Sequence, residues 1–132
     1  MEPSDTPPNM ILDTNIPIAY LAGEESVIRQ IIEWREQGVT LYLPSVAETE
    51  VLSFSKWNAG ERSWAEKFLA ENFLSIPFDR TLARYAGKIR AENRLKFPDA
   101  AIAAVALHSN LPLVTRNVRD FRKITNLTIV TI

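Results

Sequence analysis

Three acidic residues, Asp13, Glu50 and Asp99, occupy positions that an alternating strand–helix chain would bring together. Asp13 ends the first apolar run of the sequence, Glu50 lies in a helical stretch after the second run, and Asp99 opens an alanine-rich stretch. Carboxylates gathered at one place repel one another unless a positive group lies between them, and a hard divalent cation is the obvious candidate. The three acids therefore predict a metal site.

The polar residues at this predicted site also have explanations that need no metal. An acid such as Asp99 in the first turn of a helix interacts favourably with the helix dipole, and Asn15 could cap the helix after the first strand. Asp13 is harder to explain in this way, because strands disfavour aspartate and the residues just before it are all apolar. The common placement of the acids is what favours a metal site over coincidence.

Glu50 is the strongest single case for a metal ligand. Val46 and Phe54 stand four residues to either side of it, which predicts that its carboxylate points along the buried stripe of a helix. A buried carboxylate without a partner is costly, so it needs a metal ion or an arginine. Glu48, two positions away, is expected on a solvated face of the same helix.

Short apolar runs alternate with helical stretches along the chain, which predicts an α/β fold with a parallel sheet of about five strands, covered on both sides. Ser45 and Asp79 are expected helix N-caps, and Gly38 and Asn110 are expected at helix C-termini. The expected strands are 10–13, 39–43, 73–77, 112–115 and 127–131, and the expected helices are 15–22, 25–37, 45–58, 61–72, 79–94 and 98–109.

The predicted topology brings the polar residues to one edge of the sheet. With right-handed crossovers, the carboxyl ends of all parallel strands lie at the same edge. Asp13 closes the first strand and Asp99 begins the helix before the fourth strand, so both are expected there. Glu50 falls just below this edge, and Thr115 and Asn117 return to it. Ligands of open α/β sheets bind at the carboxyl edge, near a reversal in strand order.

The donor atoms restrict the chemistry of this site. Oxygen ligands alone select Mg²⁺ or Mn²⁺ rather than zinc or copper. Such ions bridge phosphate oxygens and lower the pKa of a bound water, so the predicted reaction is hydrolysis of a phosphodiester. The chain has no cysteine, its one histidine, His108, is expected to be a packed or surface side chain, and no serine-hydrolase, P-loop or Rossmann motif occurs.

The net charge of −1 conceals a difference between two parts of the chain. Residues 1–72 carry twelve acids against five bases, whereas residues 73–132 carry four acids against ten bases. Solvated helix faces would explain the excess of bases, and so would a basic rim that attracts a phosphate backbone towards an acidic centre. Composition alone leaves both explanations open.

The 132 residues fit one domain, and 46% apolar and 23% charged residues are ordinary values for a globular protein. Residues 1–9, with three prolines among polar residues, are expected to be a disordered N-terminal extension, and residues 10–132 to form a single domain. Neither a long apolar run nor a signal-peptide pattern occurs, so no membrane span is expected and a cytoplasmic location is the default.

Four segments, at 10–15 (MILDTN), 44–50 (PSVAETE), 98–103 (PDAAIA) and 113–121 (LVTRNVRDF), resemble the motifs of PIN-domain ribonucleases, especially VapC-like toxins of toxin–antitoxin pairs. Together they span almost the whole chain from residue 10. The resemblance implies a three-layer α/β/α sandwich, dependence on Mg²⁺ or Mn²⁺ and endonucleolytic cleavage of RNA. It also implies a homodimer and a small antitoxin partner.

Carried over to this chain, the resemblance assigns metal binding to Asp13, Glu50 and Asp99, with Asn15 and Thr115 as supporting polar residues. The bases expected to hold the RNA backbone are Arg116, Arg119, Arg94 and Lys96.

The sequence departs from the family pattern at its fourth acidic position. Many relatives have aspartate two residues after the threonine, whereas this chain has Asn117, and Asp120 lies three residues further on. We therefore expect one firmly held ion, with Asn117 or Asp120 acting through water. Two alternatives are a PIN nuclease of RNA processing outside toxin–antitoxin systems and a non-catalytic interaction module with this fold.

Overall fold

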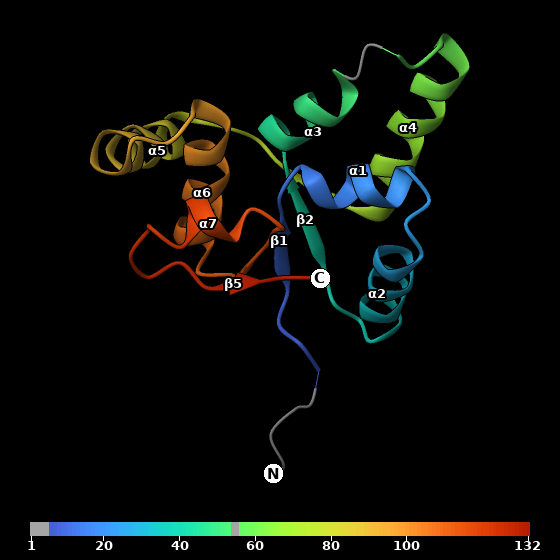
Figure 1. Cartoon of the computed structure of the whole chain (residues 1–132), viewed down its shortest axis with the longest axis horizontal. Helices are drawn as coiled ribbons and strands as arrows, with labels where there is room; N and C mark the ends of the chain where they lie inside the picture. The colour runs from blue at the N-terminus through green and yellow to red at the C-terminus, as the bar shows by residue number, and fades with distance from the viewer. Residues whose placement is uncertain (1–5, 54–55) are drawn as a thin grey trace.

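The computed structural model describes residues 6–53 and 56–132. Five parallel strands form one sheet in the order β3-β2-β1-β4-β5, with helices on both faces (Figure 1). The strands are β1 (Met10–Leu12), β2 (Leu41–Pro44), β3 (Leu74–Ile76), β4 (Leu113–Val114) and β5 (Ile129–Val130). The helices are α1 (Asn15–Leu21), α2 (Glu25–Glu36), α3 (Ser45–Leu52), α4 (Ala59–Asn72), α5 (Arg80–Asn93), α6 (Phe97–Ser109) and α7 (Val118–Phe121).

The helices divide between the two faces of the sheet as the strand order requires. The chain moves outward from β1 to β2 and β3, and then crosses to β4 and β5 on the other side of β1. Helices α1, α2 and α4 therefore lie on one face and α5, α6 and α7 on the other, while α3 stands at the end of the sheet (Figure 1). The predicted three-layer α/β/α fold is confirmed.

The strand order reverses between β1 and β4, at the centre of the sheet. Ile11 of β1 pairs with Tyr42 on one side and with Leu113 on the other. The backbone pairing continues past the strand end, because the Asp13 N–H donates to the Val114 carbonyl at 2.9 Å. The residues that follow β1 and β4 are thereby held next to each other at the carboxyl edge.

Helix α6 is buried on almost all sides and shields the central strands from solvent. Ala100 to Ala106 are each at most 1% exposed, because this helix packs against β1 on one side and against α5 on another. Five alanines among these seven positions let the neighbouring backbones approach closely. This packing fixes the start of α6, and with it Asp99, relative to the end of β1.

Several predicted boundaries are confirmed by the local geometry. The Asp79 side chain accepts from the Leu82 N–H at 2.9 Å at the start of α5. Gly38 and Asn110 have positive φ angles just after or at the ends of α2 and α6, as expected for helix C-termini. Each expected strand is present but shorter than predicted, and the short helix α7 was not predicted.

The expectation of one helix over 45–58 is wrong. Helix α3 ends at Leu52, and α4 begins at Ala59, where Asn58 and Glu61 form a reciprocal capping box. Ser45 does not cap α3, because its hydroxyl accepts a hydrogen bond from the Phe78 N–H instead. Phe54, which belonged to the expected apolar stripe, lies outside the described residues.

The expected disorder of residues 1–9 stays a prediction. Residues 1–5 lie outside the described part of the chain, and residues 6–9 contain no helix or strand. The side chain of Asn9 accepts a hydrogen bond from the Thr40 N–H at 2.9 Å, just before β1 begins.

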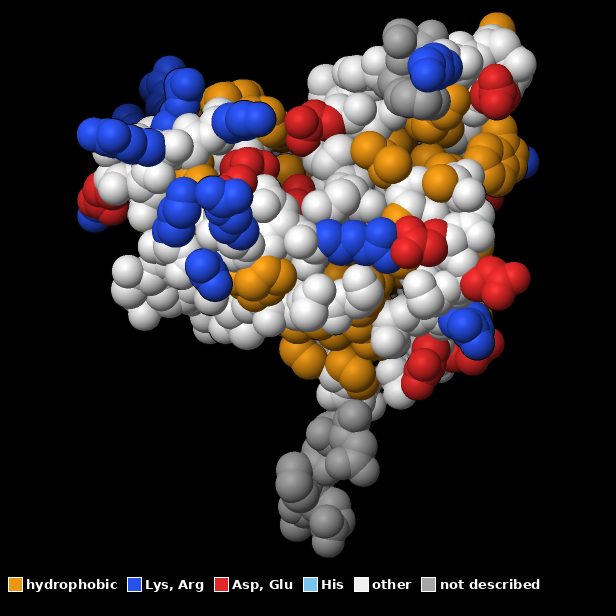
Figure 2. Space-filling view, viewed as in Figure 1, with side chains coloured by type: hydrophobic (Ala, Val, Ile, Leu, Met, Phe, Trp, Pro, Cys, Tyr) orange, Lys and Arg blue, Asp and Glu red, His pale blue; other side chains and the backbone are white. Residues whose placement is uncertain are grey.

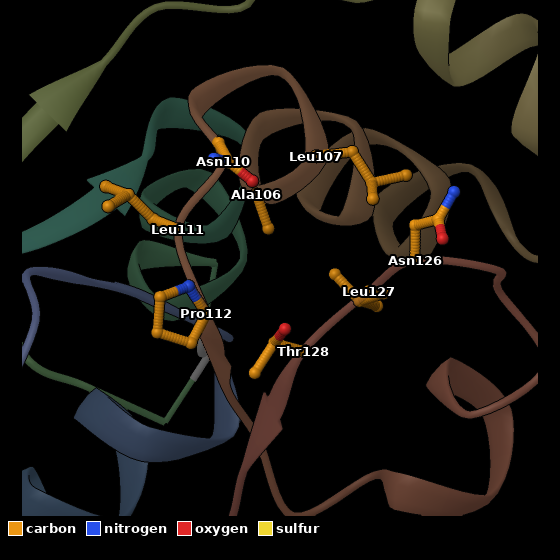
Figure 3. A pocket seen from close by; sticks show the side chains of 8 residues that line it. All are labelled: Ala106, Leu107, Asn110, Leu111, Pro112, Asn126, Leu127 and Thr128. Carbon is orange, nitrogen blue, oxygen red and sulfur yellow. The ribbon is translucent and has the colours of Figure 1, made fainter.

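A small cavity of about 70 Å³ lies at the amino edge of the sheet, opposite the predicted site. Its lining comes from the end of α6 and from the segments that precede β4 and β5 (Figure 3). The residues that line it are apolar side chains together with Asn110, Asn126 and Thr128, so none of the described residues there is acidic.

Across residues 6–53 and 56–132, every helix is too short or too polar to cross a membrane.

Candidate active site

The candidate site is built around a hydrogen bond between the ends of β1 and β4. The hydroxyl of Thr115 donates to Oδ2 of Asp13 at 2.6 Å, although the two residues are 102 positions apart. Thr115 is fully buried and Asp13 is 5% exposed. Because the strand order reverses between these two strands, the pair occupies the position where open α/β sheets bind ligands.

The carboxylate of Asp13 is oriented by three donors. Its Oδ2 accepts from Thr115 and, at 3.2 Å, from the Asn15 side-chain amide, while Oδ1 accepts from the Thr14 N–H at 2.8 Å. A carboxylate offers about four lone-pair positions, two on each oxygen. Three are used by these donors, so the remaining acceptor position lies on Oδ1.

Burial and hydrogen bonding have opposite effects on the pKa of Asp13. Burial raises the pKa of its carboxyl, the hydrogen bonds from Thr115 and Thr14 lower it, and the nearby charge of Glu50 raises it again; the net pKa is raised. The negative charge is therefore held at some cost in free energy. A cation beside Asp13 would remove that cost.

Glu50 reaches this site from the surface, which corrects the expectation that it is buried. Its side chain is exposed at the end of α3, and Val46, four residues earlier, is half-buried. The partner of its carboxylate is the hydroxyl of Thr14, which donates to Oε1 at 2.7 Å. Since α3 ends at Leu52, Glu50 stands in the last turn of a short helix and not in the middle of a long one.

Asp99 shows most clearly that the acids influence one another. It lies half-buried in the first turn of α6, and its pKa is raised from 3.8 to about 6. Burial is the largest cause, followed by the negative charges of Asp13, Asp120 and Glu50, while Lys96 lowers the pKa. Carboxylates from four different segments therefore act on one another here.

Asp120, which the sequence offered as a substitute for the missing acid, is held by Asn117. The side-chain amide of Asn117 donates to Oδ2 of Asp120 at 3.1 Å, and the Asn117 N–H donates to the Thr115 hydroxyl at 2.9 Å. Lys123 lies 3.9 Å from the other carboxylate oxygen. Asn117 thus connects the Thr115–Asp13 pair to a fourth carboxylate on α7.

The chemistry of these donors fits a hard divalent cation, but the side chains do not form a closed ligand set. Within the described residues, no three acidic or histidine side chains are close enough together to hold a metal ion. The available donors are carboxylate, amide and hydroxyl oxygens. The pKa values of Asp13 and Asp99 are raised, chiefly by burial and further by neighbouring carboxylates. That Asp13, Glu50 and Asp99 share one ion stays a prediction.

The predicted backbone-binding residues differ in how far they are free to bind a ligand. The guanidinium of Arg116 donates to both carboxylate oxygens of Glu24 at 2.8 and 2.6 Å, and its Nε donates to the Ile132 carbonyl. The same contact raises the pKa of Arg116 and lowers that of Glu24. The other three bases are exposed: Arg94, Lys96 and Arg119.

Basic residues lie beside the acids on one face of the molecule. Figure 2 shows acidic side chains in the hollow between α3 and the α6–α7 region, with Lys and Arg over α5 and α7 beside it. Lys96 is close enough to Asp99 to lower its pKa. That these bases form a rim which attracts a phosphate backbone stays a prediction. His108 is exposed and packs edge-on against Tyr85, so it lies at the surface.

Two residues of the site were missed from the sequence. Thr14 follows Asp13 and would be expected to cap the next helix, and Glu24 lies in an acidic pair that suggests only a solvated helix start. Both find partners more than 30 residues away, at Glu50 and Arg116 respectively. The only signal for Thr14 was its place beside Asp13.

The fold and the site together define a class of protein. The molecule is a parallel α/β/α domain whose strand order reverses beside a group of carboxylates, with exposed bases around them. The sequence model of the PIN domain matches residues 10–127, and the chain belongs to the PIN domain family. The resemblance seen in the four sequence motifs is thereby confirmed.

Solved structures with the same fold include toxin–antitoxin complexes. VapBC2 from Rickettsia felis, bound to a DNA fragment from their promoter, is 26% identical with a TM-score of 0.80, covering 93% of this chain and 98% of that chain. A toxin–antitoxin complex from Klebsiella pneumoniae is 27% identical (TM-score 0.77; 93% and 97% covered), and VapBC-1 from nontypeable Haemophilus influenzae is 26% identical (TM-score 0.75; 92% and 96% covered). No curated protein matches the sequence significantly.

Proposed function

We propose that this chain is a metal-dependent endoribonuclease that hydrolyses RNA phosphodiester bonds, and that it is the toxin of a toxin–antitoxin pair. The observation that carries the nuclease proposal is the convergence of four carboxylates at the reversal in strand order, where Asp13, Asp120 and Glu50 add to the effect of burial in raising the pKa of Asp99. The similarity to VapBC complexes supports the toxin role.

Asp13, Glu50 and Asp99 are the residues that would hold Mg²⁺ or Mn²⁺. The bound ion would neutralise charge on the scissile phosphate and lower the pKa of a water molecule. Asp13 offers the free acceptor position of Oδ1, because its other positions are taken by Thr115, Asn15 and the Thr14 N–H. Because these three donors already orient the Asp13 carboxylate, it would not have to reorient when the cation binds.

The other charged residues of the site would affect the pH dependence of ion binding and the binding of RNA. Asp99, with a pKa of about 6, binds a proton in competition with a cation, so ion binding should weaken as the pH falls through 6. Asp120, held by Asn117, adds negative charge at the border of the site. Arg94, Lys96 and Arg119 are exposed and would bind the RNA backbone. We place Arg116 in a structural role, because Glu24 already engages its guanidinium.

The proposed antitoxin requires a surface on this chain. An apolar groove of about 180 Å³ is lined by Ile18, Leu21, Ala22 and Trp57, and Ile18 is 44% exposed. It runs along α1, which begins directly after the acidic site. A partner with an apolar helix would fill this groove, and basic side chains on that helix would reach the acids.

We also propose that the chain forms a homodimer, which light scattering of the purified protein would test.

Cleavage assays test the nuclease proposal directly. Purified protein with Mn²⁺ or Mg²⁺ should cut a mixed RNA substrate, and EDTA should stop the reaction. Asp13→Asn should reduce the rate by at least about 100-fold, whereas Glu66→Gln, an exposed acid on α4, should not. Circular dichroism would confirm that both variants fold. A wild-type protein that never cuts RNA, or an Asp13→Asn variant as active as the wild type, would refute the proposal.

The toxin role needs a separate experiment. Co-expression with the proposed antitoxin, to be sought among small proteins encoded beside this chain, should abolish cleavage, and the two should co-purify. Ile18→Asp should weaken that complex while leaving cleavage by the isolated chain unchanged, since Ile18 lies on the exposed side of α1. An active nuclease that no neighbouring protein inhibits would speak for RNA processing outside a toxin–antitoxin pair.

A further inference from the structure

The hydroxyl of Thr14 does not cap the helix that Thr14 begins. Thr14 is the N-cap residue of α1, where a threonine normally accepts a hydrogen bond from an N–H of the first helical turn. Its side chain makes no such bond, and its own φ and ψ are already helical. The hydroxyl donates instead to Oε1 of Glu50, on α3, at 2.7 Å.

Thr14 also contacts the other side of the site. Its backbone N–H donates to Oδ1 of Asp13 at 2.8 Å. One residue therefore holds two carboxylates, one through the main chain and one through the side chain. The two carboxylates come from different elements, the end of β1 and the last turn of α3.

This contact matters because Glu50 has little else to fix it. The Glu50 side chain is exposed and has three rotatable bonds, so without a partner it would sample many rotamers. The hydrogen bond from Thr14 fixes Oε1, and among residues 6–53 and 56–132 no donor reaches Oε2. We infer that Thr14 is a positioning residue: its hydroxyl holds Glu50 so that one carboxylate oxygen faces the same ligand as Asp13.

A structural role for this hydroxyl is the competing explanation. A hydrogen bond between exposed side chains contributes little to folding, because water replaces it when it is lost. The Thr14 hydroxyl does not cap α1, so removing it costs the helix nothing. The contact should therefore affect ligand binding more than stability.

This inference rests on the proposed function, because it names what Thr14 does for the proposed metal site. Thr14→Val keeps the shape and the backbone N–H but removes the hydroxyl, and Thr14→Ser keeps the hydroxyl. The probe is Mn²⁺ alone, with the free ion measured by electron paramagnetic resonance in the absence of RNA. Residues that orient metal ligands typically change affinity by about 10–100-fold when they are removed.

We expect Thr14→Val to weaken Mn²⁺ binding about 10-fold, and Thr14→Ser to stay within about 3-fold of the wild type. In a Glu50→Ala background the same Thr14→Val change should have no further effect, because the hydroxyl then has no partner to hold. The urea midpoint of metal-free Thr14→Val should equal that of the wild type.

Three results would overturn the inference. They are an unchanged affinity in Thr14→Val, an effect of Thr14→Val that persists without Glu50, and a Thr14→Ser variant as weak as Thr14→Val. If the wild type binds Mn²⁺ and cuts RNA, any of these refutes only the role of Thr14. If the wild type neither binds Mn²⁺ nor cuts RNA, the proposed function fails and the inference fails with it.

Discussion

Replacing Asp99 by asparagine should stabilise the metal-free protein at neutral pH. The unfolded chain ionises this carboxyl near 3.8, whereas in the folded protein its pKa is about 6. Between these values the folded state retains a proton that the unfolded state has lost. The free energy of unfolding therefore falls as the pH rises from 4 towards 6, and the stability that is lost does not return at higher pH.

The magnitude follows from the size of this shift. A rise from 3.8 to about 6 corresponds to about 3 kcal/mol if the group were fully buried. Asp99 is only half-buried, so solvent reduces the combined effect of burial and repulsion, and about 1–2 kcal/mol remains. Asparagine also loses the favourable interaction of a carboxylate with the start of α6, which takes back about 0.5 kcal/mol. The net gain should be about 1 kcal/mol, or about 4 °C in Tm.

Urea denaturation of Asp99→Asn and wild type, both with EDTA, would measure this difference at pH 4.0 and at pH 7.5. The gain should appear at pH 7.5 and vanish at pH 4.0, where the wild-type carboxyl is protonated. Glu66→Gln removes the same charge from an exposed site on α4 and should show no pH-dependent gain. A less stable Asp99→Asn at pH 7.5, or an equal change at both pH values, would refute the raised pKa assigned to Asp99.

Three further substitutions test other contacts of the site and the fold. Thr115→Val removes the buried hydroxyl that holds Asp13, and should lower the unfolding free energy by about 2 kcal/mol in urea titrations. Asn117→Asp places a second carboxylate beside Asp120, so the metal-free protein should lose about 1 kcal/mol at pH 7.5 by the same measurement while its affinity for Mn²⁺ rises. Asn58→Ala breaks the capping box of α4 and should cost about 1 kcal/mol in thermal unfolding without changing the rate of RNA cleavage.

Each of these has an outcome that would count against it. A neutral Thr115→Val would mean that the 2.6 Å hydrogen bond contributes nothing net to stability. If Asn117→Asp weakened Mn²⁺ binding, the amide of Asn117 itself would be a ligand and not only a support for Asp120. A loss of cleavage in a folded Asn58→Ala would show that α4 takes part in activity.

The fold class could be predicted because it depends on signals that lie close together along the chain. Apolar runs separated by helical stretches determine a parallel sheet covered on both sides, and the cap at Asp79 and the left-handed residues Gly38 and Asn110 determine where helices begin or end. The placement of Asp13 and Asp99 at one edge followed from the direction of parallel strands. These are properties of a few residues and of the backbone they share.

What the sequence left undetermined depends on packing between distant segments. The periodicity around Glu50 suggested one long helix with a buried carboxylate, but the chain ends α3 at Leu52 and starts α4 with its own cap at Asn58, so Glu50 is exposed. Arg116 was expected to face RNA, and the fold instead brings it to Glu24. Neither result could be predicted from the residues adjacent in sequence.

The same holds for the centre of the site. The sequence by itself determined which oxygen-bearing side chains reach the carboxyl edge of the sheet. Only the tertiary structure decided that β1 lies beside β4, so that Thr115 binds Asp13, and that α3 approaches α1, so that Thr14 binds Glu50. Local patterns act over a few residues, whereas each of these hydrogen bonds requires two chain segments to be fixed by the packing of everything between them.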